Sequence, residues 1–315
     1  MPRSDNLGRA FEYICIKCLD EEISKTRPVS VIQNSNYLQD RNAWLCLDEK
    51  TQLRMEKEAR AAIPTIRELE PMIEENSGDV LTLRLQSDRE GIIGDVRDIL
   101  LIRENENWVI GISVKHNHFA VKHSRLSSVL DFGDSWLSMP CSKEYWDAIS
   151  PVFTPLEEKR GIMKWRELPN KEETVYIPLL KAFIDEVMRD YQIDNSVPTR
   201  MVEYLLGKYD FYKLIGLDAQ KKTCIMSFNL RGTLNKPSKT KQPSRKIPTS
   251  LLPTRIVSMS LKPKSKNTVE LFMDNGWQFS FRIHNASTLI EPSLKFDIQI
   301  VGMPTTIITI YCSWT

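Results

Sequence analysis

The stretch from Gly94 to His123 constrains the fold of this chain most strongly, because it reads as a β-hairpin with charged residues at its open end. Ile99 to Ile102 and Trp108 to Val114 are two short apolar runs that are rich in β-branched residues. A polar segment, Glu104 to Asn107, lies between them, and this pattern is typical of two strands joined by a tight turn. The sequence therefore predicts a hairpin within a sheet.

The open end of this hairpin carries Asp95, Asp98 and Lys115. If the turn is symmetric, Asp98 stands opposite Ser113, and Lys115 shares their face because side chains alternate along a strand. A shift of one residue in the turn would favour Asp95 instead. An aspartate and a lysine at this spacing are typical of metal-dependent phosphodiesterases, in which the aspartate holds Mg²⁺ and the lysine acts on water or phosphate. The alternative is a surface hairpin with solvated ends.

A helix expected from Asp5 or Asn6 to about Ser24 contains a carboxylate on its apolar side. The apolar arc of this helix runs from Phe11 to Ile23, and Glu12 falls inside it. Burial of an unpaired charge is costly, so we expect this glutamate to have a partner, to be neutral or to bind a metal. The alternative is a boundary glutamate that the helix dipole favours near the first turn.

The remaining segments predict a chain that mixes helices and strands. Helical structure is expected at residues 48–63, at 64–76 after a break at Pro64, and at 139–165, 176–191 and 198–217. Strands are expected at residues 79–86, 222–230, 255–261, 268–273, 277–284, 294–301 and 307–312. Residues 27–44 have no clear period, and Asp274-Asn275-Gly276 is a strong hairpin turn. The C-terminal part is therefore expected to be predominantly antiparallel β.

Charge is distributed unevenly along the chain. The net charge is +2, but residues 231–266 contain ten Lys or Arg and no acidic residue, which leaves −8 on the rest. This imbalance suggests a local contact with phosphate. Residues 233–253, rich in Pro, Ser and Lys, are expected to form a mobile or DNA-ordered loop. Since no apolar window approaches 18 residues and no signal core is present, we expect a cytoplasmic protein with no membrane partner.

The segment after the hairpin holds three of the four histidines of the chain within eight positions. A zinc site there would lack an obvious fourth ligand, so polar contacts to phosphates and base edges fit the segment better. The residues of this segment that we expect to contact nucleic acid are Asn117, His118, Lys122, His123 and Arg125.

These motifs together resemble the PD-(D/E)XK nucleases, and in particular the HaeIII-type restriction endonucleases. The resemblance rests on GRAFEY (Gly8 to Tyr13), GDVRDILLIR (Gly94 to Arg103), ISVKHNHFAVKHSRLS (Ile112 to Ser127), WQFSFRIHNAS and EPSLKFDIQIVG. It implies an α+β (α/β) fold with an αβββαβ catalytic core, helical insertions and a C-terminal antiparallel β region. It also implies Mg²⁺-dependent hydrolysis of double-stranded DNA as a type II restriction endonuclease, with GGCC as the target in that family.

Carried over residue by residue, the catalytic residues are Glu12, Asp98 and Lys115, with Glu12 and Asp98 as metal ligands. The position two before the lysine, normally Asp or Glu, is Ser113 here. Serine is a poor Mg²⁺ ligand, so we expect Glu12 to supply the missing acid. The further catalytic candidates are Asp95, Ser113 and His116. A GC-only target requires Arg or Lys at guanine, and the further recognition candidates are Arg125, Arg282, His284, Asn285 and Lys295.

Three segments are expected along the chain: a PD-(D/E)XK-like catalytic core with a helical insertion at 1–165, a mainly helical connection at 166–230, and a basic loop with an antiparallel β DNA-recognition region at 231–315. A palindromic target predicts a homodimer, and a restriction system implies a cognate DNA methyltransferase as a genetic partner. Two alternatives remain. One is a structure-specific DNA or RNA nuclease with the same core, and the other is a catalytically inert DNA-binding protein, which Ser113 leaves open.

Overall fold

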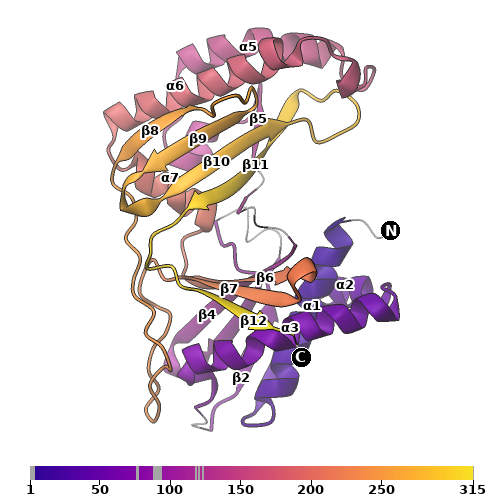
Figure 1. Ribbon diagram of the computed structural model, residues 1–315, viewed down its shortest axis with the longest axis vertical. Coiled ribbons are helices and arrows are strands. Elements are labelled where there is room, and N and C mark those ends of the chain that lie inside the picture. The colour runs from indigo at the N-terminus through magenta and orange to yellow at the C-terminus, as the bar shows by residue number, and fades with distance from the viewer. Residues whose placement is uncertain are drawn as a thin grey trace. The chain divides into compact units, whose positions relative to one another are not determined.

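The computed structural model describes residues 4–75, 78–87, 94–117, 119, 121–122 and 124–314 (Figure 1). The chain divides into two compact units, each assembled from separate stretches of sequence. Unit 1 comprises Met1–Phe119, Gly207–Ser250 and Thr305–Thr315, and unit 2 comprises Ala120–Leu206 and Leu251–Pro304. Both units combine helices with a sheet, so the predicted α+β class is confirmed.

Within its described residues, unit 1 combines a seven-stranded mixed sheet with α-helices. The helices are α1 (Ser4–Ile23), α2 (Ser35–Leu45) and α3 (Glu49–Leu69). The strands, in spatial order, are β1 (Val29–Ile32), β2 (Leu81–Leu85), β3 (Ile99–Arg103), β4 (Trp108–His116), β6 (Phe211–Leu217), β7 (Lys222–Phe228) and β12 (Thr309–Ser313). The β1–β2 and β4–β6 pairs are parallel and the other pairs are antiparallel. The expected order of a helix, a helical insertion and three strands is present in α1, α2 with α3, and β2 to β4, and the structure adds β1 between α1 and α2.

The core of unit 1 packs α1 and α3 against one face of this sheet. Ile112 and Val114 of β4 and their neighbour Leu214 of β6 are buried in this core. Because side chains alternate along a strand, Ser113 and Lys115 project from the opposite face of β4. One face of β4 thus stabilises the fold, while the other carries the polar residues predicted from the sequence.

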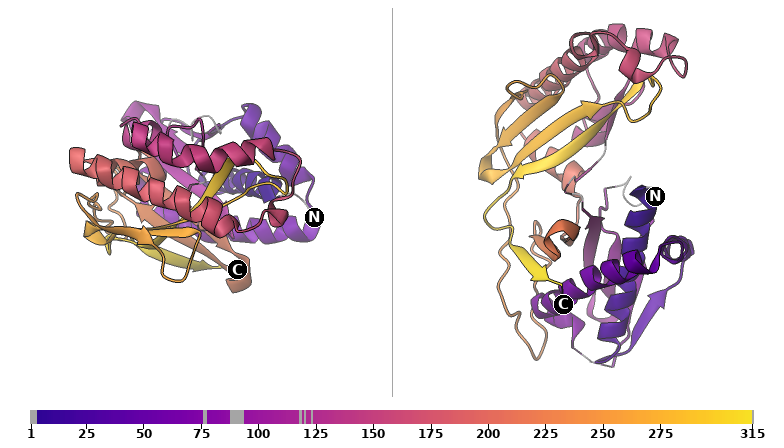
Figure 2. Two further views of the ribbon diagram at one scale, coloured as in Figure 1. Left: turned by 90° about the horizontal axis from the view of Figure 1, so that it is seen from above. Right: turned by 45° about the vertical axis from the view of Figure 1, so that its right-hand side comes forward.

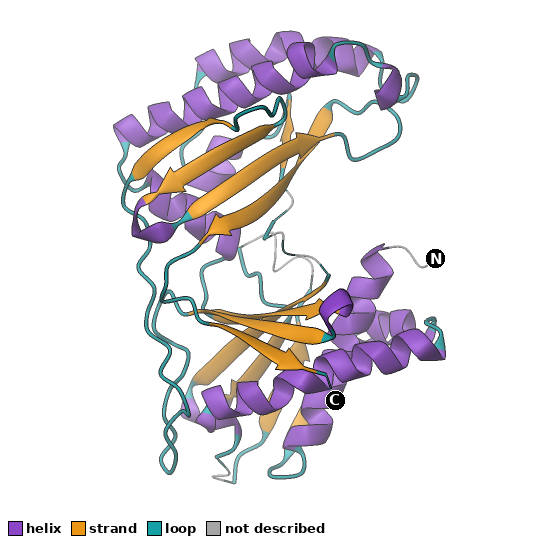
Figure 3. Ribbon diagram, in the orientation of Figure 1, coloured by secondary structure: helices purple, strands orange, loops and turns teal. Residues whose placement is uncertain are grey.

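Unit 2 is an antiparallel sheet covered by helices. Its strands, in spatial order, are β5 (Arg125–Ser127), β11 (Ser293–Gly302), β10 (Gln278–His284), β9 (Thr268–Met273) and β8 (Ile256–Leu261). Its helices are α5 (Lys143–Glu158), α6 (Ile177–Ile193) and α7 (Val197–Leu206), and α5 and α6 run side by side (Figures 2 and 3). Phe183 of α6 packs on Phe281 and Phe296, with ring centroids 5.6 and 5.2 Å apart. The predicted C-terminal antiparallel region is confirmed, and its β9–β10 turn has Asn275 at φ 55°.

Two predicted helical segments differ from the structure. The segment 198–217 is divided, because α7 ends at Leu206 and β6 follows as a buried central strand. A fully buried strand has a continuous apolar run, which periodicity does not separate from a buried helix. The break expected at Pro64 is absent in α3, which continues to Leu69 because a long apolar side holds it against α1 and the sheet. Residues 27–44, read as irregular, contain β1 and α2.

Most of the loop expected at 233–253 belongs to unit 1 and is hydrogen-bonded to other residues of that unit. The carboxylate of Asp210 accepts hydrogen bonds from the N–H groups of Leu230, Arg231 and Thr233 at 2.6 to 2.7 Å. Asn235 N–H donates to Glu70 at 2.6 Å. The first part of the loop is therefore fixed by carboxylates of the protein itself.

The division into units cuts the chain at other positions than the predicted boundaries at 165 and 230. Unit 2 begins at Ala120 and ends its first part at Leu206, while β12, near the C-terminus, pairs with β7 in unit 1. The physical reason is strand pairing between residues far apart in sequence, which composition does not reveal. The assignment of separate catalytic and recognition segments stays a prediction.

Candidate active site

The register predicted for the β3–β4 hairpin is confirmed. Ile99 pairs with Ile112, and the Asp98 N–H donates to the Ile112 carbonyl at 2.9 Å. Asp98 therefore stands across from Ser113, and Lys115 shares the face of Ser113. The hairpin brings an acidic and a basic side chain to one end of the sheet.

One carboxylate oxygen of Asp98 accepts three hydrogen bonds. Asp98 Oδ2 receives the Val114 N–H at 2.6 Å, the Ser113 hydroxyl at 3.1 Å and the Lys115 ammonium at 3.2 Å. Within the described part of the chain, no donor reaches the other oxygen, Oδ1. The side chains of Asp98 and Lys115 are 21% and 33% exposed. Asp98 is thus oriented through one oxygen, and the pair is accessible to a ligand.

Glu12 lies on α1, within electrostatic reach of Asp98 and Lys115. Burial raises the pKa of Glu12 well above its usual value, the charge of Asp98 raises it further, and Lys115 lowers it. Asp40 adds to the rise and Arg9, which pairs with Asp40 at 3.2 Å, opposes it. The structure therefore gathers the three predicted catalytic residues in one place. A carboxyl group whose ionisation is disfavoured by burial and by a neighbouring carboxylate is a common feature of functional sites.

Asp95, the alternative to Asp98, is bound to an arginine. Its two oxygens accept hydrogen bonds from Arg97 Nε and Nη2, both at 2.7 Å, and its side chain is 8% exposed. Burial is the largest effect on the pKa of Asp95 and would raise it, but the hydrogen bonds from Arg97 and Gln86 and the charge of Arg97 together lower that pKa. Arg97 in turn stacks on Tyr209 at 4.1 Å and lies over Gly111, whose absent Cβ would be 2.0 Å from Arg97 Cδ. Asp95 is therefore committed to holding Arg97.

His116, the residue after Lys115, lies between two carboxylates. Its Nδ1 is 3.1 Å from Glu58 Oε1, and its Nε2 is 3.5 Å from Asp218 Oδ2. The spacing of these three side chains would also suit a metal ion. However, Arg54 already lies 3.0 Å from the same Asp218 oxygen, and its positive charge disfavours a cation there. Both ring nitrogens of His116 thus have acidic partners, Glu58 of α3 and Asp218, which directly follows β6.

The histidine-rich segment after β4 is described only in part. His118 and His123 lie outside the described residues. The Asn117 amide donates to the Asp218 carboxylate at 3.0 Å, and its oxygen accepts the Asp218 N–H at 3.0 Å. Asn117 is therefore tied to the end of β6.

Three predicted DNA contacts form a row across the sheet of unit 2. Arg125 of β5 pairs with Lys295 of β11, and Lys295 pairs with His284 of β10. Partners on adjacent strands project from the same face of a sheet. Arg282, two residues before His284, shares this face and pairs with Asp297 at 3.1 Å. We call Arg125, Lys295 and His284 the basic row.

Two other predicted contacts have structural partners in unit 2. The Asn285 amide donates to the carbonyls of Ser287 and Leu289 and so closes the loop after β10. Lys122 donates to the Tyr204 carbonyl at 3.0 Å and lies 3.7 Å from the centre of the Tyr204 ring. Burial lowers the pKa of Lys122 to about 8. These side chains point into unit 2 rather than to the basic row.

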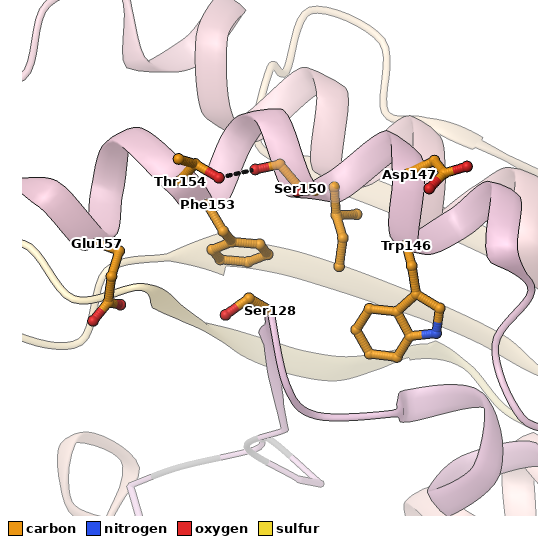
Figure 4. Close-up of a pocket in the computed structure, with 8 residues that line it drawn as sticks. Ser128, Trp146, Asp147, Ser150, Phe153, Thr154 and Glu157 are labelled. Carbon is orange, nitrogen blue, oxygen red and sulfur yellow. Dashed lines mark hydrogen bonds between the residues drawn. The ribbon is translucent and has the colours of Figure 1, made fainter.

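A pocket of about 490 Å³ lies along α5 in unit 2 (Figure 4). Its described lining includes Trp146 and Phe153 as apolar walls and the carboxylates of Asp147 and Glu157, with no Lys or Arg. An anionic phosphate would be repelled by this lining. The pocket is therefore not a candidate for the DNA backbone.

Lys213 on β6 is a polar residue that the sequence analysis did not single out. It pairs with Ser113 in the parallel β4–β6 ladder and is 4% exposed. Its ammonium donates to the Phe119 carbonyl at 3.1 Å. The sequence contained one usable signal, Gly207, because a glycine commonly follows the last residue of a helix. In the structure Gly207 has the φ of +85° that is typical of this position. A helix ending there would have left Phe211–Leu217 to be read as a strand.

Among the described residues, no helix is long and apolar enough to cross a membrane. The family described as HaeIII restriction endonuclease matches residues 8–304 of the chain. The type II restriction enzyme HaeIII of Haemophilus aegyptius is 52% identical over 314 residues, which cover 99% of this chain and 98% of that relative. No solved structure shows a significant match.

Proposed function

Because the chain belongs to the HaeIII restriction endonuclease family, we propose that it cleaves double-stranded DNA at GGCC with Glu12, Asp98 and Lys115 as its catalytic residues. It is a type II restriction endonuclease, a site-specific deoxyribonuclease. The observation that carries the residue assignment is Asp98, whose Oδ2 is held by Ser113, Val114 and Lys115 while Glu12 lies within electrostatic reach.

The residues of this site fit a hard divalent cation such as Mg²⁺. Asp98 Oδ1 has no donor among the described residues, and Glu12 carries a carboxyl whose ionisation is suppressed by burial and by Asp98. A cation between them would relieve this repulsion, and carboxylate oxygens are the ligands that Mg²⁺ prefers. When bound, Mg²⁺ would supply Lewis-acid polarisation of the phosphate and a more acidic water.

Lys115 acts on the phosphate side of the site. Its ammonium is oriented by the 3.2 Å hydrogen bond to Asp98 and is one-third exposed, so it can reach a bound phosphate or the attacking water. Its positive charge is positioned before the reaction begins, so it stabilises charge that develops on the phosphate oxygens. Lys115 therefore aligns water and stabilises the transition state.

Ser113 supports Asp98 rather than replacing the missing acid. Its hydroxyl donates to Asp98 Oδ2 at 3.1 Å, and its side chain is buried. An acid at this position would repel Asp98, whereas the hydroxyl fixes its rotamer. His116 is likewise a supporting residue, because Glu58 and Asp218 hold both of its ring nitrogens.

The basic row of unit 2 is the proposed surface for DNA recognition. A positive strip attracts the phosphate backbone, and an Arg or Lys can pair with guanine O6 and N7. A palindromic GGCC target suits a two-fold homodimer, and protection of host DNA requires a cognate methyltransferase as a genetic partner. We place the enzyme in the cytoplasm with its DNA substrate.

A plasmid digest tests this function. The purified protein is expected to cut unmodified plasmid into discrete fragments whose ends map to GGCC sites with Mg²⁺ and to leave it intact with EDTA. The Asp98→Asn, Lys115→Met and Glu12→Gln proteins should bind a GGCC duplex but cut it at least about 100-fold more slowly, because only transition-state stabilisation is lost. Single-turnover cleavage and equilibrium binding in Ca²⁺ measure the two effects separately.

The matched control is Asp95→Asn, which alters the neighbouring aspartate that is bound to Arg97. Its cleavage should fall less than that of Asp98→Asn after correction for any loss of stability. Full activity of both Asp98→Asn and Lys115→Met would refute the site. Normal Mg²⁺ dependence in Glu12→Gln would remove only Glu12, and fragments that end at branched structures instead of GGCC would indicate a structure-specific nuclease.

A further inference from the structure

Position 113 is where the resemblance leads one to expect an acid, and the structure has a buried lysine beside it. Ser113 of β4 and Lys213 of β6 are register partners in the parallel β4–β6 pair, so their side chains project from the same face. Lys213 is 4% exposed, which is rare for a lysine without a specific role. A buried lysine thus lies next to position 113, where the family resemblance predicts an acidic residue.

The environment of Lys213 includes both members of the Asp98–Lys115 pair. Burial is the main reason why the pKa of Lys213 falls to about 7; the charge of Lys115 lowers it further, and that of Asp98 acts in the opposite direction. Lys213 therefore lies within electrostatic reach of both Asp98 and Lys115. Cys224 on β7, the register partner of Ile215, adds a smaller effect of the same sign as Asp98.

Lys213 also fixes the chain that leaves β4. Its ammonium donates to the Phe119 carbonyl at 3.1 Å, four residues after Lys115. The Asn117 N–H donates to the Gly216 carbonyl at 2.9 Å, so β6 holds this chain at two points. Movement of this exit would change the direction of Lys115, which lies on the same strand.

We propose that Lys213 is a positioning residue of the cleavage site, which orients the Asp98–Lys115 pair by anchoring the exit of β4 and by placing its buried amino group beside Ser113. This inference rests on the proposed function of that pair.

The Lys213→Met protein tests the proposal. Methionine keeps the length and apolar stem of the side chain but removes the charge and the donor, and replacing a buried charge by an apolar group is often neutral for stability or raises it. The expected result is an unchanged or higher melting temperature and binding of the GGCC duplex in Ca²⁺ within about 3-fold of wild type. The single-turnover cleavage rate should fall by about 10-fold to 100-fold.

The Lys213→Gln protein separates the two parts of the role. Glutamine can still donate to the Phe119 carbonyl but carries no charge, so an intermediate rate is expected if anchoring and charge both contribute. Lys222→Met is the matched control, because Lys222 is an exposed lysine at the start of β7 on the same sheet. Its binding, cleavage rate and melting temperature should equal those of wild type.

Several outcomes would overturn the role of Lys213. Wild-type cleavage by both Lys213 variants would do so, and so would unfolding of both, which would assign Lys213 to the stability of the sheet. A parallel loss of binding and cleavage would make it a DNA contact instead. If Asp98→Asn and Lys115→Met are inactive while Lys213→Met is normal, only this inference fails and the proposed function stands.

Discussion

Two buried ionisable residues of unit 1, Glu70 and Lys213, and the partly buried Glu12 show how the position of a side chain changes its pKa. Burial raises the pKa values of Glu12 and Glu70, and it lowers that of Lys213 to about 7. In each residue the charged form is disfavoured because water is excluded. Glu12 and Lys213 lie beside Asp98, whereas Glu70 accepts hydrogen bonds from the Tyr212 hydroxyl and the Asn235 N–H, both at 2.6 Å. Glu70 therefore reports on stability rather than on catalysis.

Because the pKa of Glu70 is raised in the folded protein, we expect the protein to lose stability as pH rises. Burial raises its pKa from 4.5 to about 7, although the hydrogen bonds from Tyr212 and Asn235 oppose this. Between these two pH values the folded protein binds more protons than the unfolded chain, so the free energy of unfolding falls with increasing pH, by up to ~3 kcal/mol. Glu70→Gln cannot lose a proton and should remove this contribution. Urea unfolding of both proteins at pH 5 and pH 8 measures the difference.

The control for this prediction is Glu68→Gln, because Glu68 is an exposed carboxylate two residues away on α3. Its stability should follow that of wild type at both pH values. If the curves of wild type and Glu70→Gln run parallel, Glu70 keeps an ordinary pKa in the folded protein.

Strand β6 is the element that joins the helical side of unit 1 to the site. Tyr212 and Leu214 face the core, while Lys213 faces the side of Ser113. Gly216 pairs with His116 and leaves space for the carboxylate of Glu58, since a Cβ at Gly216 would lie 1.0 Å from Glu58 Oε1. A single strand thus positions residues on both of its faces.

Gly216→Ala is expected to destabilise unit 1. The added methyl group must displace the buried Glu58 carboxylate and break its 3.1 Å contact with His116. Overpacking of this kind costs about 1–3 kcal/mol, and the displaced carboxylate adds to that cost. Thermal unfolding should show a lower melting temperature, and cleavage should fall as His116 and the neighbouring Lys115 lose their support.

Gly8→Ala provides the comparison, because a Cβ at Gly8 in α1 meets no atom within 4 Å. Alanine is favoured over glycine in a helix by up to about 1 kcal/mol, so this variant should be as stable as wild type or more stable. A Gly216→Ala protein with unchanged stability would mean that Glu58 does not occupy this space.

At the scale of the whole molecule, the chain passes between its two units four times, after residues 119, 206, 250 and 304. Each unit is therefore completed by stretches that are distant in sequence. Strand β12, which pairs with β7 in the sheet of unit 1, follows the last residue of unit 2 in the sequence. Truncation at the predicted boundaries, 165 or 230, would remove strands from both sheets. The proposed division of labour is cleavage by unit 1 and recognition by the basic row of unit 2.

Neutralising the basic row should weaken DNA binding in a salt-dependent manner. Replacement of both Arg125 and Lys295 by Ala removes two charges on neighbouring strands, so the affinity for DNA should fall and the slope of log K against log salt should decrease by about 1 for each lost phosphate contact. A change of discrimination among target sequences would indicate a base contact instead. Fluorescence anisotropy in Ca²⁺ at several salt concentrations measures both.

Lys143→Ala is the control, because Lys143 is 82% exposed on α5, which packs with α6 rather than on the basic row. Its salt slope should equal that of wild type. If the Arg125 and Lys295 replacements bind DNA with an unchanged slope and affinity, another surface contacts the phosphates.

The sequence alone contained the local features of the site. The β3–β4 register, the shared face of Asp98, Ser113 and Lys115, and the first helix follow from alternation, turn symmetry and helical periodicity, which act over a few residues. The carboxylate of Glu12 on the apolar side of that helix was also visible. The family resemblance added the chemistry that these residues would perform.

Only the tertiary structure decided which distant residues complete the site. Lys213 meets Ser113 through the pairing of β4 with β6, and their positions are 100 residues apart in sequence. The structure also decided between Asp95 and Asp98 as the site residue. Arg97 binds Asp95, and this pairing depends on the space above Gly111. Such contacts depend on long-range strand pairing and on the volume available between packed elements, and neither quantity is encoded in a local pattern of residues.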